Sequence, residues 1–177
     1  MLAKQNPLDL SRVVLVGHSA GGHLAMWAAA LARVPVASAI HFEDPLPVRG
    51  VLDLAGPLDL TANIAGYERL CRDTVTTGLL GGTPAVVRER YSQASPIHLL
   101  PVGVPQVIVM DEHEDFVPRA FAEAYTRAAP QAGDHLQLIV VPRVGHFEIA
   151  SPRASPWPQV LSAIQSLLDG QLPPKNQ

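Results

Sequence analysis

The feature that most constrains this chain is a serine flanked by glycines where one sequence pattern gives way to another. Residues 17–21 read Gly-His-Ser-Ala-Gly. Before them, residues 12–16 form a short, β-branched apolar run that is typical of a buried strand. After them, apolar side chains recur at helical spacing, at Leu24, Trp27, Ala28 and Leu31. The sequence therefore predicts a strand that turns sharply into a helix, with Ser19 at the turn.

Three further apolar runs predict the rest of a sheet, over residues 48–54, 104–110 and 136–141. Helical patterns cover residues 119–129 and the segment from Pro156 to Asp169. Strands that alternate with helices imply right-handed crossovers and a parallel sheet. We therefore predict an α/β fold with about four parallel strands and flanking helices.

The domain organisation follows from the length of the chain and from one irregular stretch. A chain of 177 residues suits a single domain, which we assign to residues 1–170. Residues 57–95 show no sustained period, and we expect them to form a cap of short helices over a site. Residues 171–177 are expected to be a flexible tail.

Composition excludes several classes of protein. The net charge is −3, and no run of Lys or Arg could neutralise a row of phosphates, which argues against a nucleic-acid partner. No apolar run approaches the roughly 18 residues of a membrane span or resembles a signal peptide. A single cysteine, Cys71, allows no internal disulfide and is expected to be an ordinary buried or half-buried thiol. These features favour a soluble cytoplasmic protein without a membrane partner.

The turn at Ser19 predicts a nucleophile. A Gly-x-Ser-x-Gly motif between a strand and a helix places the serine in a strained conformation that lifts its hydroxyl above the end of the sheet. Gly17 and Gly21 would leave room for the neighbouring strand and helix. The helix start supplies free N–H groups for a developing oxyanion, and the N–H of Ala20 is the expected donor.

A serine needs a base, and the base needs a carboxylate that orients it. His146 follows the last predicted strand, and Asp115 follows the strand before it. Both lie in loops at the carboxyl ends of strands, where ligand sites occur in open α/β sheets. Ser19, Asp115 and His146 are therefore the candidate catalytic residues. Asp111 is the alternative acid.

Four segments carry a resemblance to a known family: GHSAGGHLA, SPIHLLPVGVPQVIV, EDFVP and VGHFEIASP. They resemble α/β-hydrolase esterases of the group that includes kynurenine formamidase-like and prolyl-oligopeptidase-like enzymes. The resemblance implies a Ser19–His146–Asp115 triad that cleaves small esters or amides without a cofactor or metal. It also implies that Gly17 and Gly21 serve the turn.

The chain departs from that family pattern in two places. About four strands normally precede the serine strand and bring a second oxyanion donor, but this chain begins just before that strand. We expect the open edge of the serine strand to promote a homo-oligomer. Near Asp115, the acidic residues Asp111, Glu112 and Glu114 stand where a His-Gly pair is usual, and like charges raise the pKa of a carboxyl. The alternative hypothesis is therefore a truncated, weak or inactive hydrolase fold that acts as an interaction module.

The other polar residues near these motifs have simpler interpretations. His18 is expected to pack at the turn, and His23 is expected to face outward from the helix. His113 lies among acidic residues, but the histidine spacing matches no standard metal-ligand pattern. Asp59 is expected to stabilise a local turn.

Overall fold

The computed structural model describes residues 8–112 and 116–174. The strands there are β1 Val14–His18, β2 Gly50–Leu54, β3 Gln106–Asp111 and β4 Leu136–Val141. The α-helices are α1 Ala20–Ala29, α2 Ile64–Cys71, α3 Val75–Leu80, α4 Arg88–Ala94, α5 Arg119–Gln131 and α6 Trp157–Leu168. Short 3₁₀ turns occupy η2 Leu31–Arg33, η3 Pro96–Leu99 and η4 Glu148–Ala150.

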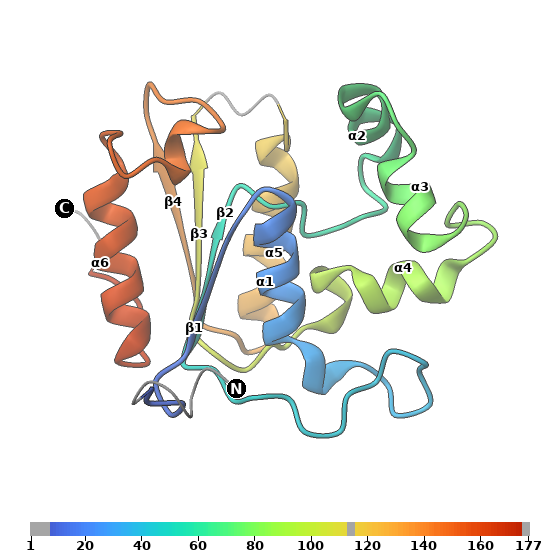
Figure 1. Cartoon of the computed structure of the whole chain (residues 1–177), viewed down its shortest axis with the longest axis horizontal. Helices are drawn as coiled ribbons and strands as arrows, with labels where there is room; N and C mark the ends of the chain where they lie inside the picture. Colours follow the sequence, from blue (N-terminus) through green and yellow to red (C-terminus); the bar gives the residue numbers. More distant parts are fainter. Residues whose placement is uncertain (1–7, 113–115, 175–177) are drawn as a thin grey trace.

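The strands form one parallel sheet in the order β1-β2-β3-β4, which confirms the predicted α/β fold. Helices α1 and α5 cover one face of the sheet, and α6 covers the other (Figure 1). Since the strands are parallel, their carboxyl ends all lie at the same end of the sheet, at the top of Figure 1. The loops that leave these ends carry Ser19 and His146.

The core is divided into two layers by the sheet. On one side, strand residues such as Val51 and Ile108 pack with Met26 of α1 and Tyr125 of α5. On the other side, the adjacent strand residues, such as Leu52 and Val107, point to the opposite face of the sheet and pack with α6. Strands β2 and β3 are buried along their whole length. Strand β1 lies at an edge and pairs, within the described residues, with β2 alone, and its Val16 is 44% exposed.

Strand boundaries follow the prediction to different degrees. Strand β4 occupies the predicted residues 136–141. Strand β1 runs from Val14 to His18 instead of over residues 12–16, because Gly17 and His18 continue the pairing with β2 although neither is a typical strand residue.

The predicted apolar face of α1 is only partly correct, because Trp27 and Leu31 pack against the buried cluster of Ala30 and Val34 but Leu24 does not. Leu24 is 57% exposed, and the buried residues of this helix are Gly22, His23, Ala25 and Met26. The reason is close packing, since the small residues Gly22 and Ala25 let the start of α1 approach the sheet, with Met26 packed beneath it.

Residues 57–95 contain three short helices on the side of α1 and α5 that faces away from the sheet (Figure 1). Asp59 stabilises the turn before them, as predicted, because its Oδ1 accepts hydrogen bonds from the N–H and hydroxyl of Thr61 at 2.8 and 2.6 Å. Tyr67 of α2 joins the core beneath α1, and Leu80 of α3 packs with Tyr91 of α4. We call α2 and α3 the cap helices.

Candidate active site

Ser19 occupies the turn between β1 and α1 with a left-handed backbone, at φ 54° and ψ −124°. Its N–H donates a hydrogen bond of 2.8 Å to the carbonyl of Leu54, so the turn is held to the end of β2. A non-glycine residue in this region costs about 1–3 kcal/mol and persists where the surrounding structure determines it. The strained backbone predicted for this serine is therefore present.

Two close contacts explain why glycines surround the turn. A Cβ at Gly17 would collide with the carbonyl group of Gly21, and a Cβ at Gly22 would collide with the carboxyl group of Asp53. At Gly21, in contrast, a Cβ would meet nothing within 4 Å. The steric need for glycine thus falls on Gly17 and Gly22, and the second of these was not singled out from the sequence.

His146 lies in the loop after β4 and is only 5% exposed. Its ring stacks on Phe116 with the centroids 4.6 Å apart and lies 4.6 Å from the ring of His18. The Nε2 of His18 lies 2.8 Å from the carbonyl oxygen of His146, and because a carbonyl only accepts, this nitrogen carries the hydrogen. The residue directly before Ser19 therefore holds the His146 loop, so Ser19 and His146 lie at the same end of the sheet.

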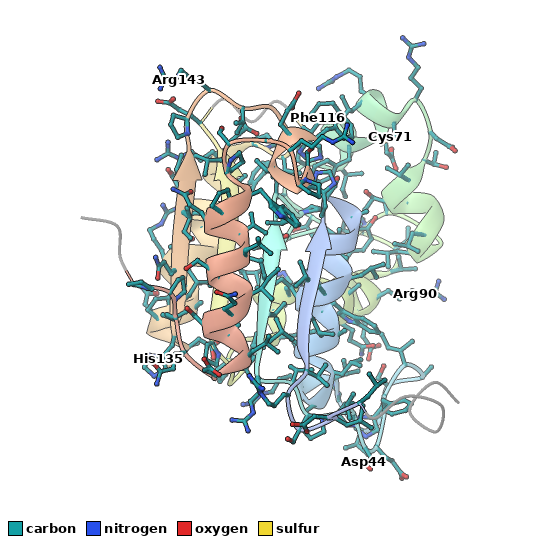
Figure 2. All side chains as sticks on the ribbon, turned by 60° about the vertical axis from the view of Figure 1, so that its left-hand side comes forward. Asp44, Cys71, Arg90, Phe116, His135 and Arg143 are labelled. Carbon is teal, nitrogen blue, oxygen red and sulfur yellow. The ribbon has the colours of Figure 1, made fainter. Side chains whose placement is uncertain are left out.

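Figure 2 shows the same arrangement from a second direction. Phe116 and Cys71 are labelled at the end of the molecule toward which the strands point, and His135 lies at the opposite end. The aromatic group around His146 also includes Phe147, whose ring meets those of His146 and Phe116 edge-on. Phe147 itself is exposed to solvent.

The predicted acid, Asp115, lies outside the described residues, as does His113. The alternative acid, Asp111, is the last residue of β3 and is buried. Its position at the carboxyl end of a central strand is compatible with a role near His146, since Asp111 lies opposite Val141, the last residue before the His146 loop.

A buried carboxyl group that the sequence analysis missed lies beneath the serine turn. Asp53 of β2 is opposite Gly17 in the sheet and is fully buried. Its Oδ1 accepts a hydrogen bond of 2.8 Å from the N–H of Gly56, and its Oδ2 has no hydrogen-bond partner within residues 8–112 and 116–174. Burial raises the pKa of Asp53 to about 7. The sequence could have indicated this buried carboxyl, because Asp53 is the single acidic residue in the apolar run of residues 51–55.

A cavity of about 250 Å³ opens between the serine turn and the cap helices. It is lined by Ser19, Ala20 and His23 on one side and by Leu70, Val75 and Leu79 on the other. Its described lining contains no Lys, Arg, Asp or Glu side chain. Cys71 lies at the rim and is exposed, so the expectation of a buried or half-buried thiol is wrong. The cavity is therefore an uncharged and mostly apolar pocket beside the serine.

His23 does not face outward from the helix, which corrects the prediction. It is 6% exposed, and its Nδ1 lies 2.8 Å from the carbonyl oxygen of Pro57. Burial lowers the pKa of His23, although the hydrogen bond to Pro57 opposes that shift. The error arose because the helix turns its small residues toward the sheet, which brings His23 inward.

Neither a metal cluster nor a membrane span is found in the described part of the chain. No three His, Cys, Asp or Glu side chains gather there in a way that could hold a metal ion. None of the described helices has the length and apolar character needed to cross a bilayer.

Comparison with solved structures supports the same fold. A truncated carbohydrate esterase from gut microbiota has a TM-score of 0.66 and 22% identity, with 81% of this chain and 55% of that chain covered. Est2, an esterase from Thermogutta terrifontis, has a TM-score of 0.62 and 22% identity, with coverages of 93% and 57%. A puromycin-hydrolyzing peptidase from Mycobacterium tuberculosis has a TM-score of 0.72 and 17% identity, with coverages of 97% and 24%.

These likenesses establish the α/β-hydrolase fold, and the chain spans little more than half the length of the two esterases. No curated protein matches the sequence. A family model does match, over residues 2–127, which is more than half of the chain. The protein therefore belongs to the BD-FAE family, with an α/β-hydrolase fold whose solved neighbours are esterases and peptidases.

Proposed function

We propose that this protein hydrolyses small carboxylic esters, and amides more slowly, through an acyl-enzyme formed on Ser19. The observation that carries the proposal is the strained backbone of Ser19 beside an apolar cavity, with His146 at the same end of the sheet. Strain at a surface turn is retained where function requires it. The esterases and peptidases among the structural neighbours support the same class of reaction.

The reaction would proceed in two balanced steps. The Ser19 hydroxyl attacks the substrate carbonyl carbon while its proton passes to the His146 imidazole, and the oxyanion accepts a hydrogen bond from the N–H of Ala20. The C–O or C–N bond then breaks as His146 returns the proton to the leaving alcohol or amine. Water repeats the sequence on the acyl-enzyme and releases the acid, which regenerates the serine.

Asp115 is proposed as the carboxylate that orients His146, with Asp111 as the alternative. The two are separated by substituting each with Asn. A loss of turnover of about 10⁴-fold is expected for the orienting acid, because an amide in its place favours the wrong imidazole tautomer. We expect this loss in Asp115→Asn and a smaller one in Asp111→Asn. The reverse order would assign the role to Asp111.

A second candidate is a weakly active or inactive fold that serves as an interaction module, since the chain covers only 55% and 57% of the two esterases. In this fold the second oxyanion donor comes from a loop outside the serine turn, and none is assigned among the described residues. Removing one such donor lowers turnover by about 10²–10³-fold. Slow but Ser19-dependent turnover is therefore the expected behaviour of the enzyme.

A serine-reactive fluorophosphonate probe separates the two candidates. The wild-type protein should be labelled, and Ser19→Ala should abolish labelling. Ser92→Ala is the matched control, because Ser92 is an exposed serine whose hydroxyl only donates to the carbonyl of Glu89. Folded wild-type protein that takes up no label, or label that persists in Ser19→Ala, would favour the interaction module.

We also propose that the edge of β1 pairs with β1 of a second copy. Residues Val13 and Ser19 direct their backbone groups toward β2, through hydrogen bonds with Arg49 and Leu54. Since neighbouring residues of a strand point in opposite directions, the N–H and C=O groups of Val14 and Val16 face outward. An antiparallel pairing of two β1 strands through Val16 would give these outward-facing groups partners.

Size-exclusion chromatography with light scattering tests this pairing. The wild-type protein is expected to be a dimer, and Val16→Lys is expected to be a monomer because a lysine on each strand would oppose its symmetry mate. A wild-type protein that is monomeric at about 0.1 mM would reject the proposed pairing, and so would a Val16→Lys variant that remains a dimer.

A further inference from the structure

His23 holds a position from which it can contact the substrate. It lies in the first turn of α1, four residues after Ser19, which precedes the helix as its N-cap. Its N–H bonds to the carbonyl of Ser19, so the two residues belong to one helical turn. Its side chain lines the cavity beside Ser19 and Ala20.

The hydrogen bond to Pro57 determines which nitrogen of His23 carries the hydrogen. The carbonyl oxygen of Pro57 accepts only, so Nδ1 must be the donor across the 2.8 Å contact. Burial favours the neutral ring by lowering the pKa of His23. A neutral imidazole with its hydrogen on Nδ1 has a lone pair on Nε2. Among the described residues, His23 has no other side-chain hydrogen bond, so this acceptor is available to a ligand.

The cavity lies on the acyl side of the serine. In the proposed reaction His146 must hand a proton to the leaving group, so the leaving group lies on the side of His146. Ser19, Ala20 and His23 line the cavity directly, whereas His146 meets it only through Phe116, which lines the cavity and stacks on the His146 ring. The acyl group is therefore the part of the substrate that enters. The volume of about 250 Å³ corresponds to roughly eight groups of the size of a water molecule.

We propose that Nε2 of His23 accepts a hydrogen bond from a hydroxyl or N–H group on the acyl chain, two or three atoms from the scissile carbonyl. The substrate class is a short, uncharged acyl group with such a donor, of which 3-hydroxyacyl esters are the simplest members. This inference rests on the proposed esterase function and makes His23 a specificity-determining residue. A buried acceptor that a substrate leaves unpaired lowers its affinity, which is how such a site rejects the unsubstituted chain.

Kinetics with a pair of esters tests the proposal. We expect the wild-type kcat/KM to be about tenfold higher for 4-nitrophenyl 3-hydroxybutyrate than for 4-nitrophenyl butyrate, after each value is divided by the uncatalysed rate of the same ester. His23→Asn retains an N–H for Pro57 but lacks an acceptor at the position of Nε2, so its ratio should fall to about one. His23→Gln places an amide oxygen near that position and should restore part of the preference.

A wild-type ratio near one, or an unchanged ratio in His23→Asn, would overturn the proposal. A binding measurement separates this failure from failure of the esterase itself. Ser19→Ala cannot form the acyl-enzyme, and by calorimetry it should bind 3-hydroxybutyranilide about tenfold more tightly than butyranilide. Equal binding overturns the role of His23. If the protein binds 3-hydroxybutyranilide more tightly but the wild type hydrolyses neither ester, the role of His23 is supported and only the proposed esterase function is rejected.

Discussion

The serine turn and the cap helices face each other across one cavity but are built in opposite ways. At the turn, Gly17 and Gly22 pack so closely against their neighbours that no other residue fits, and Ser19 is held in a strained conformation. On the cap, Leu70, Val75 and Leu79 line the cavity while remaining exposed, and Leu79 is 71% exposed.

This difference separates two requirements of a hydrolase. The reacting hydroxyl must be held within a fraction of an ångström, and dense backbone packing achieves this. The wall that meets the acyl group must suit a particular substrate, and exposed side chains on short helices can change with little effect on the core. Substitutions on the turn should therefore act on stability and chemistry together, and substitutions on the cap should act on substrate affinity alone.

The largest effect is expected for Gly17→Ala. The new methyl group would meet backbone atoms of Gly21 and not a flexible side chain, so the free energy of unfolding should fall by about 5 kcal/mol, near the upper limit for point substitutions. Urea denaturation measures the change. Gly21→Ala is the control, since open space surrounds that position, and it should match the wild type or gain up to about 1 kcal/mol. Similar losses in both variants would show that the turn is not sterically determined.

Asp53 should make the stability of the turn dependent on pH. The pKa of this carboxyl is raised from 3.8 to about 7 in the folded protein, so the folded state keeps the proton while the unfolded state releases it. The stabilisation is complete below pH 3.8, is lost as the pH rises to about 7, and changes no further above that. The difference of about three pH units corresponds to at most roughly 4 kcal/mol.

The variant Asp53→Asn tests this dependence, because its amide oxygen can still accept from Gly56 but cannot ionise. Its free energy of unfolding, relative to the wild type, should rise between pH 4 and pH 7 in urea titrations. Asp44→Asn, which removes a carboxyl from an exposed loop, controls for the change in net charge. A flat difference for Asp53→Asn would mean that the buried carboxyl titrates as it does in the unfolded chain.

Ser19→Gly should be more stable than the wild type but inactive. Glycine adopts positive φ without the cost that serine incurs, so the variant should be more stable by about 1–2 kcal/mol while it loses all reaction with the fluorophosphonate probe. Thermal unfolding and labelling are measured on the same sample. Ser19→Ala is the comparison, since it removes the hydroxyl but keeps the strain. Equal melting temperatures for the two variants would count against stored strain at this position.

Leu79→Ser should have the smallest effect on folding. Leu79 is mostly exposed, so the free energy of unfolding should stay within about 0.5 kcal/mol of the wild type. The KM for an ester with a hexanoyl chain should rise about threefold, because the variant removes apolar surface from the cavity wall. A large loss of stability would show that the cap depends on this side chain for its own packing.

The sequence was most informative where local pattern and tertiary structure agree. Strand β4 and the serine turn were predicted closely, because an apolar run and a Gly-x-Ser-x-Gly motif depend little on distant residues. The face of α1 was predicted only in part, since the burial of His23 depends on how closely the helix approaches β2. Asp53 was missed for the same reason, because its role appears only when Gly22 and Gly56 close over it.

The lining of the cavity could not be predicted from the sequence, which indicated only a cap of short helices over residues 57–95. Its cap wall comes from α2 and α3, two short helices whose positions are set by Tyr67 and Leu80 and not by a sustained apolar stripe. Its other wall comes from residues next to Ser19, which are far away in the sequence. A pocket made by such distant segments leaves no periodic signal.

The cap helices and the serine turn face each other across the cavity. An acyl group in the cavity would add apolar contacts that the empty protein lacks, with Leu79 and Val75 on one side and His23 on the other. The melting temperature of this protein should therefore rise when an acyl group occupies the cavity. It should be highest for the acyl-enzyme, in which the acyl group is covalently bound to the serine.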